Sequence, residues 1–402
     1  MSKKINLIII CVISFFYLFL RIYNLESLIT FHLDQGLQLN EAHQMIQNRH
    51  INLVGPMVTT KIFEGRGFFI GPFYTYSLAF LGIISQWNPL VVTFLLIIIE
   101  YLSLLLFINW LYKKNNKIPI NILFIVIATT PFLIEHSRFF WNPHFLLPLS
   151  YLLIYFLENK KYFLSAIILG LGFSFHYSAV LWGFPILYYL IKNHEKIKKY
   201  LIFIPGFLIG DLPFFIFEIK HNFYNIRTMF LVFTNTNKAG EMSPYYFVFP
   251  FAAFIIFFLL KTYYINKKIF YSLIFIIISF NIFYKIKLQE KIPIGMPKGW
   301  NYIVQNKIKN KITEKCPLNY NIATTISGDT RAYDMRYLLT TAKCPPMSVH
   351  DYPNSETIFL IAPSDRPPEN ESVWEISSFK PFKVTSKEII NDDIIFYRLD
   401  KE

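Results

Sequence analysis

Long apolar runs, separated by short polar stretches, follow one another from the N-terminus to about residue 284. A helix needs roughly twenty apolar residues to cross a hydrocarbon core about 30 Å thick, and ten runs approach that length. They lie at residues 5–22, 69–86, 90–112, 118–134, 143–157, 162–175, 177–191, 200–218, 245–263 and 269–284. This pattern predicts a polytopic α-helical membrane protein.

The pattern changes after residue 284. Residues 1–284 contain 33 charged side chains (22 basic and 11 acidic), whereas residues 285–402 contain 32 (17 basic and 15 acidic) in less than half the length. Strand-like runs near 320–326, 357–362 and 394–399 accompany a helix-like stretch near 330–342. We therefore expect a transmembrane domain over 1–284 and a small water-soluble α/β domain over 285–402.

Lysines between the apolar runs indicate the orientation, because cytoplasmic loops carry an excess of Lys and Arg. Five clusters hold 14 of the 22 basic residues of 1–284: Lys3/Lys4, Lys113/Lys114/Lys117, Lys160/Lys161, Lys192 to Lys199, and Lys261/Lys267/Lys268. All five clusters can lie on the cytoplasmic side only if the run 69–86 does not fully cross the membrane. This run begins Phe-Ile-Gly-Pro and ends Gln-Trp-Asn-Pro, which suits a re-entrant or interfacial helix.

About nine crossings then place the N-terminus inside and the C-terminal domain on the extracytoplasmic side of the plasma (inner) membrane. The alternative is that 69–86 spans and one basic cluster faces outward. With nine crossings, the long loop 24–68 and the polar turns at 135–143, His176 and 219–244 all lie outside. An enzyme that works at the outer membrane surface would gather polar segments on that face.

The loop 24–68 contains Asp34, about a dozen residues after the first membrane exit. A helix-like stretch at 37–48 follows, and we expect it to lie along the membrane surface. Asp is a favoured N-cap residue, so one interpretation of Asp34 is the cap of this surface helix.

Five motifs occur in a fixed order: LDQG after the first membrane helix, GPFYTYSLAF, HSRFFWNPHFLLPL, LGLGFSFHYSA and LPFFIFEIKHNF. In this order they resemble the GT-C superfamily of membrane glycosyltransferases, specifically bacterial relatives of protein O-mannosyltransferases and of the lipid A aminoarabinose transferase. The resemblance covers roughly residues 5–285, and the later GDTRAYDMRYLL resembles the appended domain of some such proteins. The chain departs from the family in having Asp-Gln where many relatives have Asp-Glu, and in having fewer membrane helices than the larger members.

The resemblance implies transfer of a sugar from a polyprenyl-phosphate carrier to an acceptor hydroxyl on the outer face, with inversion. Such a reaction needs a carboxylate that takes the acceptor proton during attack on the anomeric carbon. Asp34 matches the family's catalytic Asp by motif and position and is the expected general base. Of two nearby acids, Glu64 is a candidate for substrate binding, and Glu41 is expected to decorate the surface helix.

The leaving lipid phosphate needs cationic or N–H partners. The candidates are Lys61, Arg66, Arg138 and His176. A guanidinium can hold two phosphate oxygens at once, so we expect Asp34 and at least one of Arg66 and Arg138 to line a common outward-facing cavity. Asn142 either orients the substrate beside Arg138 or caps the helix that begins at the next residue.

Ionisable groups inside apolar runs are costly in a bilayer and mark functional positions. His176, at the bend of a short hairpin, either contacts the carrier phosphate or closes the turn. Glu218 opens an outside loop together with His221 and Asn222 and is a candidate for sugar binding. For Glu100 and Asp211 the sequence suggests only helix–helix hydrogen bonds.

Metal and nucleotide signatures are absent from the sequence. Without Cys-x-x-Cys, His-x-x-x-His or a strong acidic cluster, no dedicated metal site is expected, and a requirement for a divalent cation stays open. No Gly-rich nucleotide pattern occurs, which fits a lipid-linked donor. The expected partners are that donor, an acceptor glycan, lipid or protein, and membrane lipids, but no nucleic acid.

Two other classes of function compete with an enzyme: a non-catalytic carrier or flippase for a lipid-linked saccharide, and a surface-assembly subunit. An enzyme needs Asp34 for turnover, whereas a carrier should tolerate Asp34→Asn.

Cys316 and Cys344 both fall in the domain that we place outside, and each precedes a proline, which favours extended backbone. An oxidising compartment permits a disulfide between them, closing a loop of about thirty residues. Two free thiols are the alternative.

Overall fold

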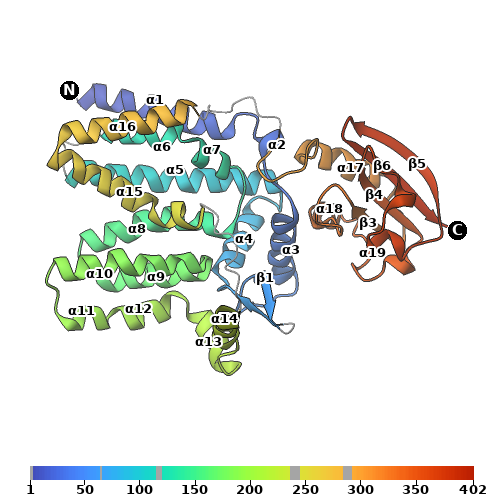
Figure 1. The fold of residues 1–402 in the computed structure, drawn as a ribbon, viewed down its shortest axis with the longest axis horizontal. Coiled ribbons are helices and arrows are strands. Elements are labelled where there is room, and N and C mark those ends of the chain that lie inside the picture. The colour runs from blue at the N-terminus through green and yellow to red at the C-terminus, as the bar shows by residue number, and fades with distance from the viewer. Residues whose placement is uncertain (1–2, 64–65, 115–119, 236–244, 284–291) are drawn as a thin grey trace. The chain divides into compact units, whose positions relative to one another are not determined.

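The computed structural model describes residues 3–63, 66–114, 120–235, 245–283 and 292–402. The chain is mostly helical and has a small mixed sheet near its C-terminus (Figure 1). Backbone packing divides it into two compact units. The helical unit comprises 1–21, 44–81 and 94–286, and the mixed unit comprises 22–43, 82–93 and 287–402.

The helical unit contains most of the helices and one β-hairpin. In chain order its elements are α1 (Lys3–Ile22), β1 (Met57–Phe63), β2 (Arg66–Phe69), α4 (Phe73–Ile84), α5 (Pro89–Lys114), α6 (Ile120–Thr129), α7 (Pro131–His136), the 3-10 helix η1 (Asn142–Phe145), α8 (Leu146–Glu158), α9 (Tyr162–Phe175), the 3-10 helix η2 (Tyr177–Trp182), α10 (Gly183–Lys192), α11 (Ile197–Leu201), α12 (Phe203–Gly210), α13 (Leu212–Lys220), α14 (Tyr224–Asn235), α15 (Tyr245–Ile265) and α16 (Lys267–Phe283). The first residues of α5 and the last residues of α1 and α4 belong to the mixed unit.

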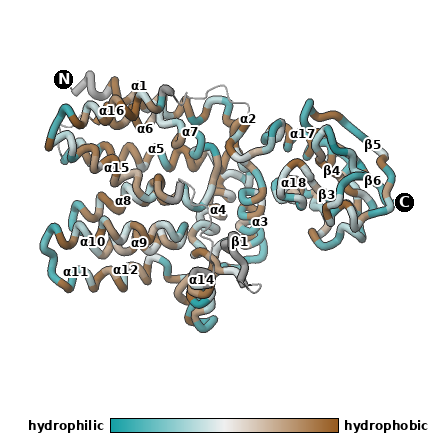
Figure 2. Tube along the Cα trace, in the orientation of Figure 1, coloured by the Kyte–Doolittle hydropathy of each residue, from teal (hydrophilic) through white to brown (hydrophobic). Residues whose placement is uncertain are grey.

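Apolar helices suited to a membrane-embedded protein dominate this unit (Figure 2). Among the described residues, α5 and the stretch Phe247–Ile265 of α15 are long and apolar enough to cross a membrane. The pair Ile197–Gly210 and Leu212–Lys220 would make a third span, but it bends by 80° at Asp211. The predicted runs 90–112 and 245–263 therefore form single long helices, and the predicted run 200–218 is broken.

Local changes of backbone structure interrupt three of the predicted runs. The run 118–134 divides into α6 and α7 where Pro131, which has no backbone N–H, begins the second helix. The run 177–191 starts as the 3-10 helix η2 before it becomes α10. Within 69–86 only α4 is helical, because the hairpin of β1 and β2 precedes it and pairs Met57 with Phe69.

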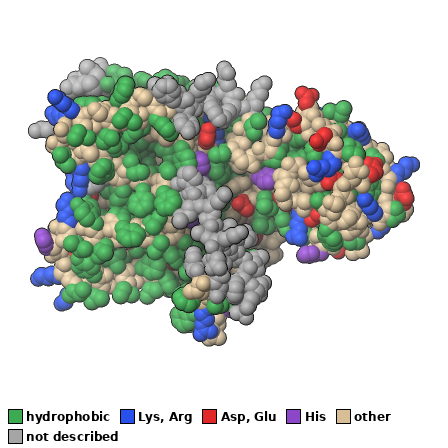
Figure 3. Space-filling view, viewed as in Figure 1, with side chains coloured by type: hydrophobic (Ala, Val, Ile, Leu, Met, Phe, Trp, Pro, Cys, Tyr) green, Lys and Arg blue, Asp and Glu red, His purple; other side chains and the backbone are tan. Residues whose placement is uncertain are grey.

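Lysines from separate loops meet at one end of the helical unit. Lys114 at the end of α5 forms an ion pair with Glu158 at the end of α8, and the charges of Lys192 and Lys261 also act on Glu158. In Figure 3 basic side chains gather at the end of the helical unit where α10 meets α11. Hydrophobic side chains cover most of the helical surface away from that end. Basic residues far apart in the sequence therefore lie on a common face of this unit.

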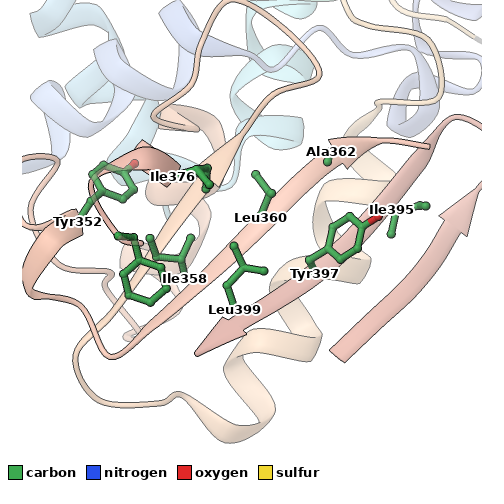
Figure 4. Close-up of a cluster of buried hydrophobic side chains, with 10 residues drawn as sticks. Tyr352, Ile358, Leu360, Ala362, Ile376, Ile395, Tyr397 and Leu399 are labelled. Carbon is green, nitrogen blue, oxygen red and sulfur yellow. The ribbon is translucent and has the colours of Figure 1, made fainter. Parts of the chain in front are cut away.

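The mixed unit contains a four-stranded sheet in the order β3-β4-β6-β5, in which β3 and β4 are parallel and the other pairs antiparallel. Its elements are α2 (Leu25–Leu28), α3 (Leu33–Gln47), α17 (Tyr302–Lys315), β3 (Tyr320–Thr324), α18 (Tyr333–Thr341), the 3-10 helix η3 (Tyr352–Asn354), β4 (Thr357–Pro363), the 3-10 helix η4 (Pro368–Asn370), α19 (Trp374–Ser377), β5 (Phe382–Asn391) and β6 (Ile394–Lys401). The last residues of α3, from Gln44, belong to the helical unit. Figure 4 shows Ile358 and Leu360 of β4 packed with Tyr397 and Leu399 of β6 in its core.

The predicted strands near 320–326, 357–362 and 394–399 and the predicted helix near 330–342 are confirmed as β3, β4, β6 and α18. A disulfide joins Cys316 to Cys344, with the Cα atoms 5.7 Å apart, so of the two alternatives that the sequence left open the disulfide is the one that forms. The structure adds β5 and α17, which the sequence pattern did not reveal.

Candidate functional site

The segment that carries Asp34 is packed within the mixed unit. Phe31 is fully buried, and its ring lies 6.1 Å from that of Tyr302 and 5.8 Å from that of Tyr337. The Thr30 hydroxyl donates to the Ile294 carbonyl at 2.7 Å. Residues of the predicted first loop are therefore anchored to elements that follow residue 287.

A buried carboxylate completes this anchor. The Gln305 side-chain amide donates to the Phe31 carbonyl and to the Asp334 carboxylate, each at 2.8 Å. The Trp300 indole N–H donates to the same carboxylate oxygen at 3.0 Å. Asp334 is almost fully buried, and burial raises the pKa of its carboxyl group. A buried acid that accepts these bonds fixes the backbone next to Asp34.

Asp34 itself lies in the first turn of α3, which begins at Leu33. The interpretation of Asp34 as the N-cap is therefore wrong, because the chain is already helical one residue earlier. Its negative charge still suits the positive end of the helix dipole. The residue is open to solvent, yet partial burial of the carboxyl group raises its pKa, and nearby His32 opposes that shift.

Glu41 lies on the same side of α3 as Asp34, because seven residues make about two helical turns. It is half-buried, and desolvation raises its pKa to about 7. The sequence analysis placed Glu41 on the exposed face of a surface helix and did not anticipate this burial. The helical period of the sequence alone does not indicate it. A carboxyl group with a pKa near neutrality is suited to acid–base chemistry.

His32 connects this helix to a loop of the mixed unit. Its Nε2 atom lies 3.2 Å from the Ser327 hydroxyl oxygen. In that loop Asp329 accepts hydrogen bonds from the backbone N–H groups of Arg331 (3.2 Å) and Tyr333 (2.9 Å). Burial, followed by the charge of Asp334, raises the pKa of Asp329 to about 6. An imidazole close to several carboxyl groups therefore borders Asp34.

A metal site is not formed by these groups. Across the described parts of the chain, no set of three or more His, Cys, Asp and Glu side chains is arranged to hold a metal ion.

The predicted phosphate ligand Arg138 lies in the helical unit and is almost fully buried. Its Nη2 atom donates to the Leu20 carbonyl near the end of α1 at 2.8 Å. The next residue of α1, Arg21, is also buried and donates to the Ala128 carbonyl at 3.1 Å. Sequence reasoning passed over Arg21, although an arginine inside an apolar run is itself a signal.

Asn142 is buried, and its amide donates to the Phe175 carbonyl at 2.9 Å, which joins the start of η1 to the end of α9. His176 caps η2, with Nδ1 accepting from the Ser178 N–H at 3.1 Å. Burial lowers the pKa of His176 to about 4. The ring is therefore neutral at neutral pH, with its proton on Nε2.

Glu218, the predicted sugar ligand, is fully buried at the end of α13. Its two carboxylate oxygens accept from the N–H groups of Asn225 (3.1 Å) and Ile226 (3.0 Å) at the start of α14. The Asn225 side chain in turn bonds to both the N–H group and the carbonyl of Phe69, at 2.5 and 2.6 Å. Glu218 thus organises the contact between α14 and β2.

The other three candidates, Lys61, Glu64 and Arg66, lie in or beside the hairpin of β1 and β2. Glu64 lies outside the described residues, and Lys61 and Arg66 are described only as backbone in β1 and β2.

No protein-family model matches the chain, and no curated protein or solved structure matches it.

Proposed function

We propose that this protein is a membrane glycosyltransferase that moves a sugar from a polyprenyl-phosphate carrier to an acceptor hydroxyl, with Asp34 as general base. The observation that carries the proposal is the placement of Asp34, which is open to solvent on a firmly anchored helix and has a raised pKa. A base must be reachable by the acceptor and basic enough to take its proton. The five ordered sequence motifs and the half-buried Glu41 on the same helix also support it.

The donor phosphate would be held by residues of the helical unit. Arg138, Arg66 and Lys61 supply positive charge, and His176 supplies a neutral N–H donor. Glu64, Asn142 and Glu218 are the proposed contributors to sugar binding, the last two through the loops that they organise.

The proposed topology has about nine crossings, α4 as a re-entrant or interfacial helix, and the C-terminal domain outside the plasma membrane. The lysines gathered at one end of the helical unit support a common cytoplasmic face. Reporter fusions after Ile286 should behave as extracytoplasmic, and fusions near Asn115 and Asn193 as cytoplasmic. An outward signal at Asn115 would mean that residues 69–86 span the bilayer.

The decisive experiment uses Asp34→Asn, which removes the proton acceptor and keeps the size of the side chain. Membranes with equal amounts of wild type and variant are incubated with a panel of labelled polyprenyl-phosphate sugars. We expect transfer to fall by orders of magnitude. Glu26→Gln is the matched control, because Glu26 is an exposed acid in the same segment. Wild-type turnover in Asp34→Asn would exclude Asp34 as the base.

A carrier or flippase for a lipid-linked saccharide is the second candidate, favoured by the broken helix pair at Asp211. Discontinuous membrane helices commonly form the binding sites of transporters. A carrier would move labelled lipid between leaflets without consuming an acceptor, and it would do so equally well with Asp34→Asn.

A further inference from the structure

Asp211 lies at the sharpest break in the helical unit. Helix α12 ends at Gly210 and α13 begins at Leu212, and the axes of the two segments differ by 80°. Pro213 in the first turn of α13 cannot continue the hydrogen-bond ladder of α12. The Asp211 side chain is fully buried at this break.

Neither carboxyl oxygen of Asp211 accepts a hydrogen bond from any described protein atom. The Ser174 hydroxyl of α9 lies close enough to polarise the carboxyl group, but it does not form a hydrogen bond of ordinary geometry with it. An isolated carboxylate buried in protein is very unfavourable, and such a group usually takes up a proton instead.

The backbone at Gly71, just before α4, packs against the Asp211 carboxyl group. A Cβ atom on Gly71 would lie 2.0 Å from the Ser174 hydroxyl oxygen and 2.6 Å from an Asp211 carboxyl oxygen. Gly71 and Pro72 lead directly into α4, and the Ser174 hydroxyl accepts from the Phe73 N–H at 3.3 Å. The carboxyl group of Asp211 therefore faces the start of the segment that we propose to be re-entrant.

Glu218 provides a contrast on the same pair of helices. It is also fully buried, but two backbone N–H groups donate to it. Donors of this kind favour an ionised carboxylate. Two buried acids seven residues apart thus have opposite surroundings.

We propose that Asp211 is a proton-binding site of the helical unit, and that its carboxyl group is protonated in the folded protein at neutral pH. The titratable groups that face it are Tyr76 of α4 and Tyr177 of η2, with Glu218 beyond Tyr177. These groups are neutral or negative, so they offer no positive charge to stabilise an ionised Asp211. A metal cation needs several oxygen ligands, and the described residues contain no cluster of three acidic, His or Cys side chains.

The proton controls the contact between Asp211 and Gly71. The neutral acid is compatible with the close approach of Gly71, whereas an ionised carboxylate would draw water or a cation into the break. Deprotonation therefore favours separation of Gly71 from Asp211.

The test uses dicyclohexylcarbodiimide, which adds to protonated carboxyl groups in apolar surroundings. The acid proton moves to a carbodiimide nitrogen, the carboxyl oxygen bonds to the central carbon, and rearrangement leaves a stable acylurea. The purified full-length protein is labelled in detergent at about pH 6.5, where an ordinary Asp is almost fully ionised, and the peptides are analysed by mass spectrometry.

We expect labelling at Asp211, its loss in Asp211→Asn, and no labelling at Glu218. Labelling that falls as the pH is raised toward about 9 would further support a titrating acid. An unlabelled Asp211, or equal labelling of both acids, would overturn the proposal. Protection of Asp211 by millimolar Na⁺ or Mg²⁺ at constant ionic strength would also overturn it, because the occupant would then be a metal cation.

A second measurement avoids the reagent. Asp211→Asn mimics the neutral acid, so its thermal midpoint should equal that of the wild type at or below about pH 4, where Asp is largely protonated in the unfolded chain as well. As the pH rises further, the midpoint of the variant should increasingly exceed that of the wild type, until the carboxyl group of the folded wild type also ionises. Parallel pH profiles of the two proteins would contradict a protonated Asp211.

Discussion

Gly36 of α3 lies against the backbone of Asp334 in α18 so closely that a Cβ atom on Gly36 would come 2.7 Å from the Asp334 Cα and nitrogen atoms. Because these neighbours are backbone atoms, they cannot move aside without displacing a helix. Only glycine fits at this position, and the contact holds the first turns of α3, which carry Asp34, against the mixed unit.

Gly36→Ala should therefore weaken this contact. We expect the free energy of unfolding to fall by about 1–3 kcal/mol, as is usual for overpacking, and hydrogen exchange across 33–47 to become faster. Gly328→Ala is the matched control, because a Cβ atom there would meet nothing within 4 Å. Unchanged exchange in Gly36→Ala would show that α3 is held in place by other contacts.

The disulfide between Cys316 and Cys344 should stabilise the mixed unit. Replacing both residues by Ser removes a constraint on the unfolded chain, and we expect a loss of about 2–4 kcal/mol in thermal or denaturant unfolding. Cys11→Ser serves as the control, since Cys11 is exposed and outside the disulfide. If the denatured, unreduced protein reacts with maleimide at Cys316 or Cys344 as well as at Cys11, the disulfide is not formed in solution.

Asp329 should make stability depend on pH. Its pKa is raised to about 6, chiefly by burial, so the folded state holds this proton more tightly than the unfolded state. The resulting stability is complete at low pH and is lost as the pH rises through about 6, by up to roughly 3 kcal/mol.

Asp329→Asn should flatten the pH dependence of unfolding between about pH 4 and 7. Asp365→Asn, a change at an exposed acid of the same unit, should leave it unaltered. A wild-type profile in Asp329→Asn would mean that Asp329 titrates normally.

His32 should set the pH range in which Asp34 acts, if Asp34 is the general base. Burial raises the pKa of Asp34 and His32 opposes this, so His32→Gln should raise that pKa further. A base works only when deprotonated, so the acid limb of kcat/KM against pH should move to higher pH. His350→Gln, at an exposed position, should not shift it, and a shift to lower pH in His32→Gln would contradict this role.

Hydropathy predicted the parts of the fold that depend on local composition. The helices α5 and α15 are long apolar segments, and the strands β3, β4 and β6 each contain a short apolar stretch. Strand β5 escaped prediction because it is a sheet edge with mostly exposed Lys, Thr, Ser and Glu side chains. Helix α17 escaped because its apolar residues are few and separated by Lys and Asn.

The site was harder to predict, because its contacts are distant in sequence. The motif around Asp34 indicated the residue, but nothing in the loop 24–68 shows that Gln305 and Asp334 hold it. Likewise, Asp211 and Glu218 look alike in sequence as acids in one apolar run. Only the three-dimensional arrangement of backbone donors separates them.

The link between Gln305 and Phe31 has a consequence for biosynthesis. These partners are 274 residues apart in the chain, so the Asp34 segment leaves the ribosome long before its anchor exists. At about 5–20 residues per second, that segment waits for tens of seconds beside a membrane with Phe31 uncovered. Closing so long a loop is slow, so a chaperone or the lipid surface itself would have to shield Phe31 until translation reaches α17.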